Sequence, residues 1–158
     1  MRKAQGFSLI ELMIVIAILA FLVLAAAPLS GAWVQDADLH EVEGSLTQAV
    51  GRAKAAALRN YAAAENNQPV TAICIANNTV SVRERTASAA PDCATPAGTL
   101  LWQDAIDEDV SIKANTVAVS CMCFNNRGFL TSDSCAGCNT LSTLTLTAGS
   151  KNVSVTIH

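Results

Sequence analysis

The sequence predicts an α+β protein, in which a long N-terminal helix is followed by a domain of antiparallel strands. Three observations predict it. No residue from Leu12 to Gln35 carries a charge. Apolar residues then recur every three or four positions from Leu39 to Tyr61, as on one face of a helix. After Pro69 short β-branched stretches alternate apolar and polar residues, which is typical of strands. A helix followed by such strands covers one face of their sheet.

The chain begins with a short basic leader and an apolar run. Arg2 and Lys3 precede the run, and Glu11 is the one carboxylate at its start. The run is long enough to cross a membrane, which takes about 20 apolar residues. The two basic residues favour a cytoplasmic N-terminus, with the rest of the chain outside. Because a carboxylate in hydrocarbon is costly, Glu11 indicates a functional partner.

Three interpretations of this N-terminus compete. An ordinary secretory signal would be cleaved after small residues such as Ala25–Ala27. A plain transmembrane anchor explains the length of the run but gives no role to Gly6 or Glu11. The third interpretation rests on residues 6–12, Gly-Phe-Ser-Leu-Ile-Glu-Leu. This stretch resembles the cleavage and assembly signal of type IV prepilins and of the related secretion pseudopilins.

The resemblance implies a type IV pilin-like fold and a processed N-terminus. Prepilin peptidase would cut between Gly6 and Phe7, and the new amine of Phe7 would be methylated. Glu11 would then pair with the N-terminus of a neighbouring subunit, which neutralises both charges and sets the register between subunits. The alternative is that Glu11 merely reaches the lipid headgroups.

The helix is expected to run from about Phe7 to about Ala64, on the order of 85 Å at 1.5 Å per residue. We divide the chain into a leader (1–6), a transmembrane or filament-core half of the helix (7–34), an amphipathic half (35–66) and a β-rich globular domain (67–158). Pro28 lacks a backbone donor and crowds the carbonyl four residues back, so a kink is expected there. In the pilin interpretation this kink is a weak point that can stretch in a filament.

Strands are predicted after the helix, and Asn77-Asn78 has the composition of a hairpin turn. Residues 86–99, with two prolines and many small side chains, are predicted to be a loop. The predicted strands are residues 70–75, 79–85, 117–124, 141–147 and 152–157.

Six cysteines, an even number, all lie after residue 70. In a segment outside the membrane this favours an oxidising compartment and disulfides. The spacings Cys121-x-Cys123 and Cys135-x2-Cys138 could instead supply four thiolates to zinc. We favour disulfides. Fifteen connectivities are possible, and the tentative pairing is Cys74–Cys93, Cys121–Cys138 and Cys123–Cys135.

The other residues do not indicate catalysis, a cofactor or a metal site. The two histidines, His40 and His158, lie on the predicted helix and at the last position. Four acids could be imagined around calcium, but their spacing is not an EF-hand loop and a solvated turn is expected: Asp104, Asp107, Glu108 and Asp109. Net charge is −3, and removing the two positive charges of the leader leaves −5. DNA binding is therefore not expected, because the basic residues are few and scattered.

The downstream sequence narrows the resemblance. Residues 51–60 resemble the Ala-Arg-x-x-Ala segment of minor pilins of the FimT/FimU type and of H-type pseudopilins, and Phe124–Gly128 resembles their Phe-x-x-x-Gly turn. A basic Gly-Arg motif at the C-terminus, which DNA-binding members use, is missing. The resemblance implies a minor type IV pilin without enzymatic activity. The alternatives are an H-type pseudopilin of a type II secretion system, or a tip subunit for DNA uptake or adhesion.

This function implies where the chain resides and what it meets. It would be a single-pass inner-membrane protein with its C-terminal domain in the periplasm, and later part of an extracellular filament. Its partners would be other pilin subunits, the prepilin peptidase, the inner-membrane assembly platform and, before assembly, the membrane itself.

Overall fold

The computed structural model describes residues 8–65, 67–95, 97–133, 135 and 138–157, with the side chains of 26–30 and 32 left out. The chain divides into two compact units, Met1–Gln35 and Asp36–His158. The single described helix, α1 (Leu9–Arg59), contributes its first part to one unit and its second part to the other. The second unit contains two antiparallel sheets, so the predicted α+β fold is confirmed.

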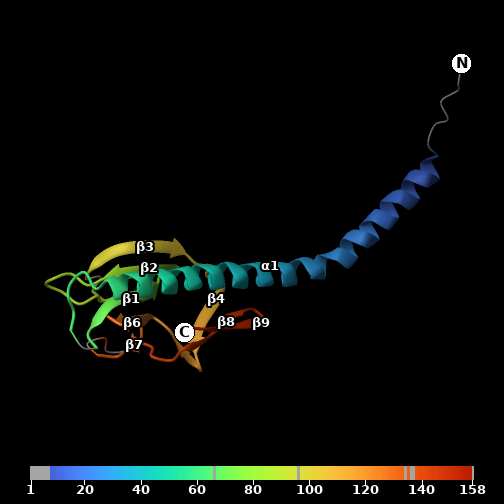
Figure 1. Cartoon of the computed structure of the whole chain (residues 1–158). Helices are drawn as coiled ribbons and strands as arrows, with labels where there is room; N and C mark the ends of the chain where they lie inside the picture. The colour runs from blue at the N-terminus through green and yellow to red at the C-terminus, as the bar shows by residue number, and fades with distance from the viewer. Residues whose placement is uncertain (1–7, 66, 96, 134, 136–137, 158) are drawn as a thin grey trace, which may run out of the picture. The chain divides into compact units, whose positions relative to one another are not determined.

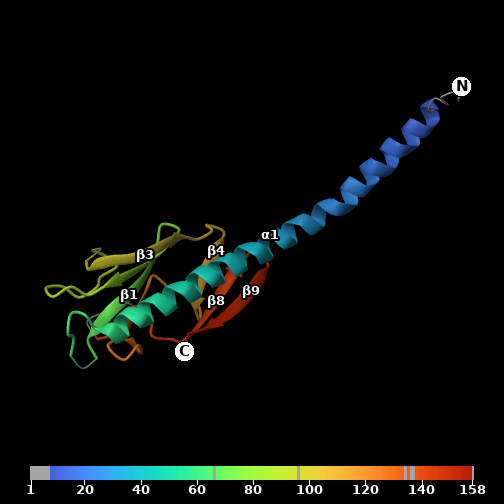
Figure 2. The same cartoon turned by 45° about the horizontal axis from the view of Figure 1, so that its top comes forward.

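Two sheets lie along the second part of α1 (Figures 1 and 2). The five-stranded sheet has the order β3-β2-β1-β6-β7, and the four-stranded sheet has the order β5-β4-β8-β9. Every paired strand is antiparallel to its neighbour. The strands are β1 (Pro69–Ala76), β2 (Thr79–Glu84), β3 (Thr99–Ala105), β4 (Val110–Ala114), β5 (Val117–Ala118), β6 (Cys121–Asn125), β7 (Leu130–Thr131), β8 (Thr143–Ala148) and β9 (Lys151–Thr156).

One ridge of α1 forms the core together with both sheets. The predicted stripe is buried at Leu39, Val42, Leu46, Ala53 and Ala57, and Val50 is partly buried. Large side chains from the two sheets complete the same cluster: Ile73, Val80, Val82, Met122 and Phe124 from the first, and Ile112, Leu144 and Leu146 from the second. A single helix face therefore supplies one layer for two different sheets.

Small side chains bring the end of α1 close to the first sheet. Ala53, Ala56 and Ala57 are fully buried, and the Thr71 hydroxyl of β1 donates a hydrogen bond to the Ala53 carbonyl over 3.1 Å. A larger side chain at these helix positions would hold strand and helix apart. The hydroxyl of Thr71, which is itself fully buried, finds its partner only because the helix backbone is within reach.

The helix ends five residues before the predicted end. Asn60 has a positive φ of 43°, and its N–H donates to the carbonyls of Ala56 and Ala57. Its side-chain amide also bonds the backbone of Ala64 in both directions. Asparagine tolerates this left-handed conformation at a helix C-terminus, and it captures carbonyls that would otherwise lack donors. Tyr61, which we expected on the buried stripe, is consequently 90% exposed.

Five predicted strands are present and three others were missed. The Asn77-Asn78 turn has φ of 50° and 55°, as a two-residue hairpin of type I′ requires. The strand predicted over residues 117–124 is divided into β5 and β6, which belong to different sheets. The missed strands are β3, β4 and β7. β3 is a mostly exposed edge strand without alternation, and it is a strand because β2 supplies its hydrogen bonds.

All six cysteines are paired, which confirms the prediction of disulfides. The bridges are Cys74–Cys93, Cys121–Cys138 and Cys123–Cys135. Their Cα–Cα distances are 5.3, 4.7 and 6.5 Å, within the range that disulfides adopt. These are the pairs named tentatively from the sequence. Each such bridge is expected to stabilise a domain of this size by about 2–4 kcal/mol.

The bridges cover the face of the first sheet that points away from α1. Along β1, Ile73 belongs to the core under the helix, whereas Ala72 and Cys74 belong to a second cluster with Cys123 and Cys135. Successive residues of a strand point to opposite faces of the sheet, so Ile73 faces the helix whereas Ala72 and Cys74 face the disulfides. This arrangement also explains why six consecutive residues of β1 are buried.

Truncation of the helix ridge tests this packing. Leu46 is 1% exposed within the cluster, so Leu46→Ala should lower the free energy of unfolding by about 2–5 kcal/mol, because it leaves a cavity. Leu58→Ala is the matched control: Leu58 lies on the same helix but is 63% exposed, and its loss should cost much less. Denaturant unfolding of the detergent-solubilised chain measures both. Equal losses would contradict the assignment of the core ridge.

Candidate functional site

The first candidate site is the start of α1. Ser8 precedes the first helical residue, and the Leu12 N–H donates to the Ser8 carbonyl over 3.2 Å. Glu11 therefore occupies the third helical position. A serine before the helix and a glutamate three residues later form the sequence pattern of a capping box. A carboxylate here also meets the positive end of the helix dipole. Glu11 thus has a local structural reason for its position, besides any role between subunits.

The described apolar side chains that follow Glu11, as far as Ala25, are exposed. Every described side chain from Ser8 to Ala25 is exposed, with Phe21 at 73% and Leu24 at 76%. Exposed apolar surface of this extent marks a region that lipid or another protein covers. In the parts of the chain that the structure describes, no helix meets the length and hydropathy needed to cross a membrane.

Two of the predicted site residues, and the side chain of a third, lie outside the described part of the chain. Gly6 and Phe7, on either side of the expected cleavage site, lie outside the described residues. The side chain of Pro28 is not described either, although the α-helix is continuous from Leu9 to Arg59 through this position. The kink stays a prediction.

Two of the acids that could suggest a metal site, and His40, make other contacts. Asp104 accepts a hydrogen bond from the Ser45 hydroxyl over 2.7 Å, and Asp107 accepts one from the Asp109 N–H over 2.8 Å. The second contact closes the turn between β3 and β4. His40 lies on the exposed helix surface, with its Nδ1 3.3 Å from a carboxylate oxygen of Glu43.

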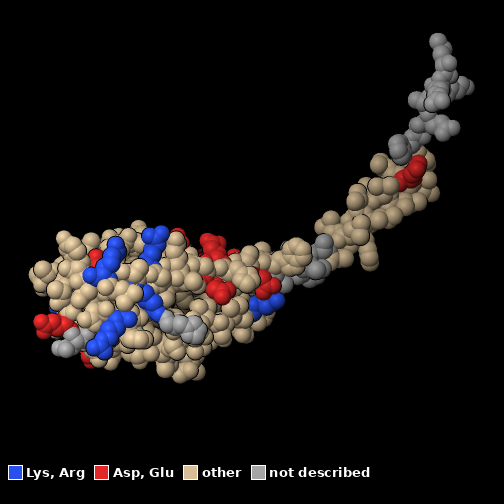
Figure 3. All heavy atoms as spheres, viewed as in Figure 1, with Lys and Arg blue, Asp and Glu red and all other residues tan. Residues whose placement is uncertain are grey.

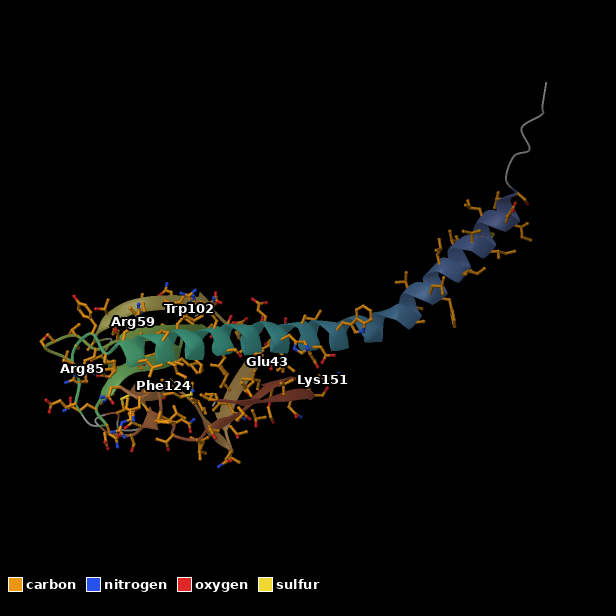
Figure 4. All side chains as sticks on the ribbon, in the orientation of Figure 1. Glu43, Arg59, Arg85, Trp102, Phe124 and Lys151 are labelled. Carbon is orange, nitrogen blue, oxygen red and sulfur yellow. A yellow bond between two sulfur atoms is a disulfide. The ribbon has the colours of Figure 1, made fainter. Side chains whose placement is uncertain are left out.

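Several basic side chains lie on one face of the second unit. Figure 3 shows several Lys and Arg groups on one face of the second unit, with acidic groups both beside them and nearer the beginning of that unit. Figure 4 places Arg59 and Arg85 at the end of the domain where α1 stops. Arg52 lies 5.4 Å from the Trp102 ring, and Lys54 lies 5.9 Å from the Phe124 ring.

The second candidate site is a cavity of about 710 Å³ beside the disulfides. Five sulfur-bearing residues line it: Cys93, Cys121, Cys123, Cys135 and Cys138. At its rim Asp92 accepts hydrogen bonds from the Thr95 hydroxyl and from the Ala94 N–H. These donors, the hydroxyl first, lower the pKa of the Asp92 carboxyl, because they stabilise its ionised form.

The Phe-x-x-x-Gly segment forms a tight turn that supports the end of the helix. The Asn125 side chain accepts hydrogen bonds from the N–H groups of Arg127 and Phe129. Gly128 has a φ of 75°, which disfavours any residue with a Cβ, and it lies next to Lys54 and Leu58. Asn125 was not singled out from the sequence. Its position within an Asn-Asn-Arg-Gly stretch between strands is the signal that could have identified it.

The comparisons with known proteins bear on the N-terminus. A model of the prokaryotic N-terminal methylation motif matches residues 1–27, which include Gly6, Phe7 and Glu11. Neither a search of curated proteins nor a search of solved structures finds a match. The match to the methylation motif at residues 1–27, together with the α+β fold that follows it, supports a type IV pilin-like prepilin.

Proposed function

We propose that this chain is a minor type IV pilin, a structural subunit that is incorporated into a pilus or primes its assembly. The observation that carries the proposal is the unpartnered apolar helix from Ser8 to Ala25, with one carboxylate in its first turn. Lipid would cover this helix before assembly and neighbouring helices would cover it afterwards. Pilin-like proteins do structural work, so the proposal includes no catalysis.

Glu11 would act when the leader has been removed. Cleavage after Gly6 creates an ammonium group on Phe7, four residues before the carboxylate. At about 4 Å, two opposite charges attract by about 1 kcal/mol in water and by about 4 kcal/mol at an effective dielectric of 20. The pair therefore becomes strong only where water is excluded, as between packed helices. This supports pairing between subunits as the step that selects the register.

The described domain supports a role outside the membrane. Its three disulfides suit an oxidising compartment. Its two sheets pack against the second part of α1. We therefore place the chain in the inner membrane with a periplasmic domain, and later in an extracellular filament. Its partners would be other pilin subunits, the prepilin peptidase and the assembly platform.

The alternative within the same class is an H-type pseudopilin of a type II secretion system. Both kinds of subunit share the methylation motif, and the segments that resemble minor pilins resemble H-type pseudopilins as well. Neighbouring genes for a pilus or for a secretion system would separate the two. Loss of pili on deletion of the gene, with secretion unchanged, would favour the minor pilin.

Substitution of Glu11 tests the pairing. Glu11→Gln retains a side chain suited to the capping box but removes the charge. We expect Glu11→Gln and Glu11→Ala to be processed normally and to enter filaments at least several-fold less than the wild type. Glu41→Gln, at an exposed acid outside the motif, should be incorporated normally. Immunoblots of sheared filaments and of membranes give both readouts. Normal incorporation of Glu11→Gln would contradict the pairing between subunits. Glu11 would then serve only to cap the start of the helix.

Mass spectrometry of the membrane-extracted protein tests processing. We expect a mature chain that begins at N-methylated Phe7. Reduction of three bridges, with two hydrogens each, should add six hydrogens to it. A chain that begins at Met1 or after Ala25–Ala27 would contradict the prepilin interpretation.

The remaining alternative is contact with DNA at a pilus tip, for which the basic side chains on one face of the second unit are the candidates. We nevertheless expect no shift of short duplex DNA by the detergent-solubilised chain at 0.15 M salt, because cation–π contacts engage Arg52 and Lys54 and the net charge is negative. A gel-shift series over salt concentration measures this. A shift that Arg59→Glu abolishes would instead support DNA binding.

A further inference from the structure

We propose that four of the cysteines form a zinc site when their two bridges are reduced. The residues are Cys121 and Cys123 of β6 and Cys135 and Cys138 of the following loop. This proposal is independent of the proposed function. It rests on where the fold places the four sulfur atoms and on what holds them there.

Three of the four sulfur atoms lie close enough together to share one metal ion, and the fourth is bonded to one of them. The Sγ atoms of Cys123, Cys135 and Cys138 all lie within 4.8 Å of one another. The Sγ of Cys121 is bonded to that of Cys138. Cys123 Sγ and Cys138 Sγ, which belong to different bridges, are 3.9 Å apart. Zn–S bonds of about 2.3 Å place the ligands of a tetrahedral site about 3.8 Å apart. To surround one ion, the bonded sulfurs of the two bridges must separate from 1.98 and 2.00 Å to about 3.8 Å, and the Cys121 sulfur must join the other three.

The backbone around these cysteines is held by contacts other than the disulfides. Cys121 and Cys123 pair with Cys74 and Ala72 of β1 in the middle of the sheet. The Asn139 N–H donates to the Cys121 carbonyl over 2.8 Å, which fastens the end of the loop to the strand. The Cys138 N–H donates to the Cys135 carbonyl over 3.2 Å and links the two ligands directly. Reduction thus leaves the scaffold of the site in place.

The surroundings suit a bound metal with a way in. Cys121, Cys123 and Cys135 are buried, and Cys138 is partly exposed. The Ser120 hydroxyl lies 4.0 Å from the Cys121 sulfur and can donate to a thiolate there. The cavity of about 710 Å³ reaches all four sulfurs, so an ion has an entry path.

The chemistry balances with a dithiol as the reductant. Two dithiol molecules reduce the two bridges to four thiols and become two disulfides. One Zn²⁺ then binds four thiolates, and four protons are released. Thiolate ligands favour zinc over magnesium or calcium, which prefer oxygen ligands. Reducing conditions would convert the two covalent bridges into one metal bridge between the same strand and loop.

Cobalt binding to the full detergent-solubilised chain tests the site. The chain is reduced with excess dithiol, freed of reductant under anaerobic conditions and titrated with Co²⁺, which gives intense visible bands in tetrahedral thiolate sites. We expect one equivalent to bind with these bands and Zn²⁺ to displace it. The oxidised chain, as its own control, should show no such bands. Circular dichroism before metal addition reports whether the sheets persist.

Two variants decide which cysteines are ligands. Cys135→Ser should lose the tetrahedral thiolate spectrum, whereas Cys74→Ser/Cys93→Ser should keep it, because that bridge is outside the set. Three outcomes would overturn the proposal: no cobalt bands in a reduced chain, whether or not its sheets persist; equal loss of the bands in both variants; or unchanged bands in Cys135→Ser.

Discussion

The structure of the domain depends on the close contact between one ridge of α1 and two sheets. Leu39, Val42 and Leu46 fill the space where side chains must be large, and the alanines that follow let β1 approach the helix backbone. The hydrogen bond from the Thr71 hydroxyl to the Ala53 carbonyl shows that β1 and the helix backbone are in direct contact. Without the helix, neither sheet has a second layer to cover its apolar face, so the strands could not bury enough surface to be stable alone.

The same helix carries two kinds of surface along its length. From Ser8 to Ala25 it is exposed and apolar on all sides, whereas within the domain it is amphipathic. A helix that is apolar all round requires an apolar environment, and an amphipathic one requires a packed face on one side. The two parts of the helix therefore need different surroundings. Glu11, at the start of the apolar segment, is the one charged side chain between Ser8 and Ala25.

Disulfide bridges, rather than a layer of large apolar side chains, cover the face of the first sheet that points away from α1. Aromatic residues make up 4% of the chain, so few large side chains are available to cover a second face. The loops that carry Cys93, Cys135 and Cys138 lie over β1 and β6 and are fastened there by the bridges. A cross-link reduces the entropy of the unfolded chain, which offsets the small apolar area that such loops can bury.

The sequence by itself determined the class of the fold, the apolar helix with its methylation motif, the buried stripe from Leu39 to Ala57 and the hairpin at Asn77-Asn78. These features are local: each follows from periodicity, from turn chemistry or from a short motif. Tertiary structure alone decided the rest. β3 and β4 are strands because neighbours complete their hydrogen bonds, and α1 ends at Arg59 because Asn60 turns left-handed there. The hydrogen bond from the Thr71 hydroxyl to the Ala53 carbonyl likewise joins a strand and a helix whose close approach no local pattern predicts.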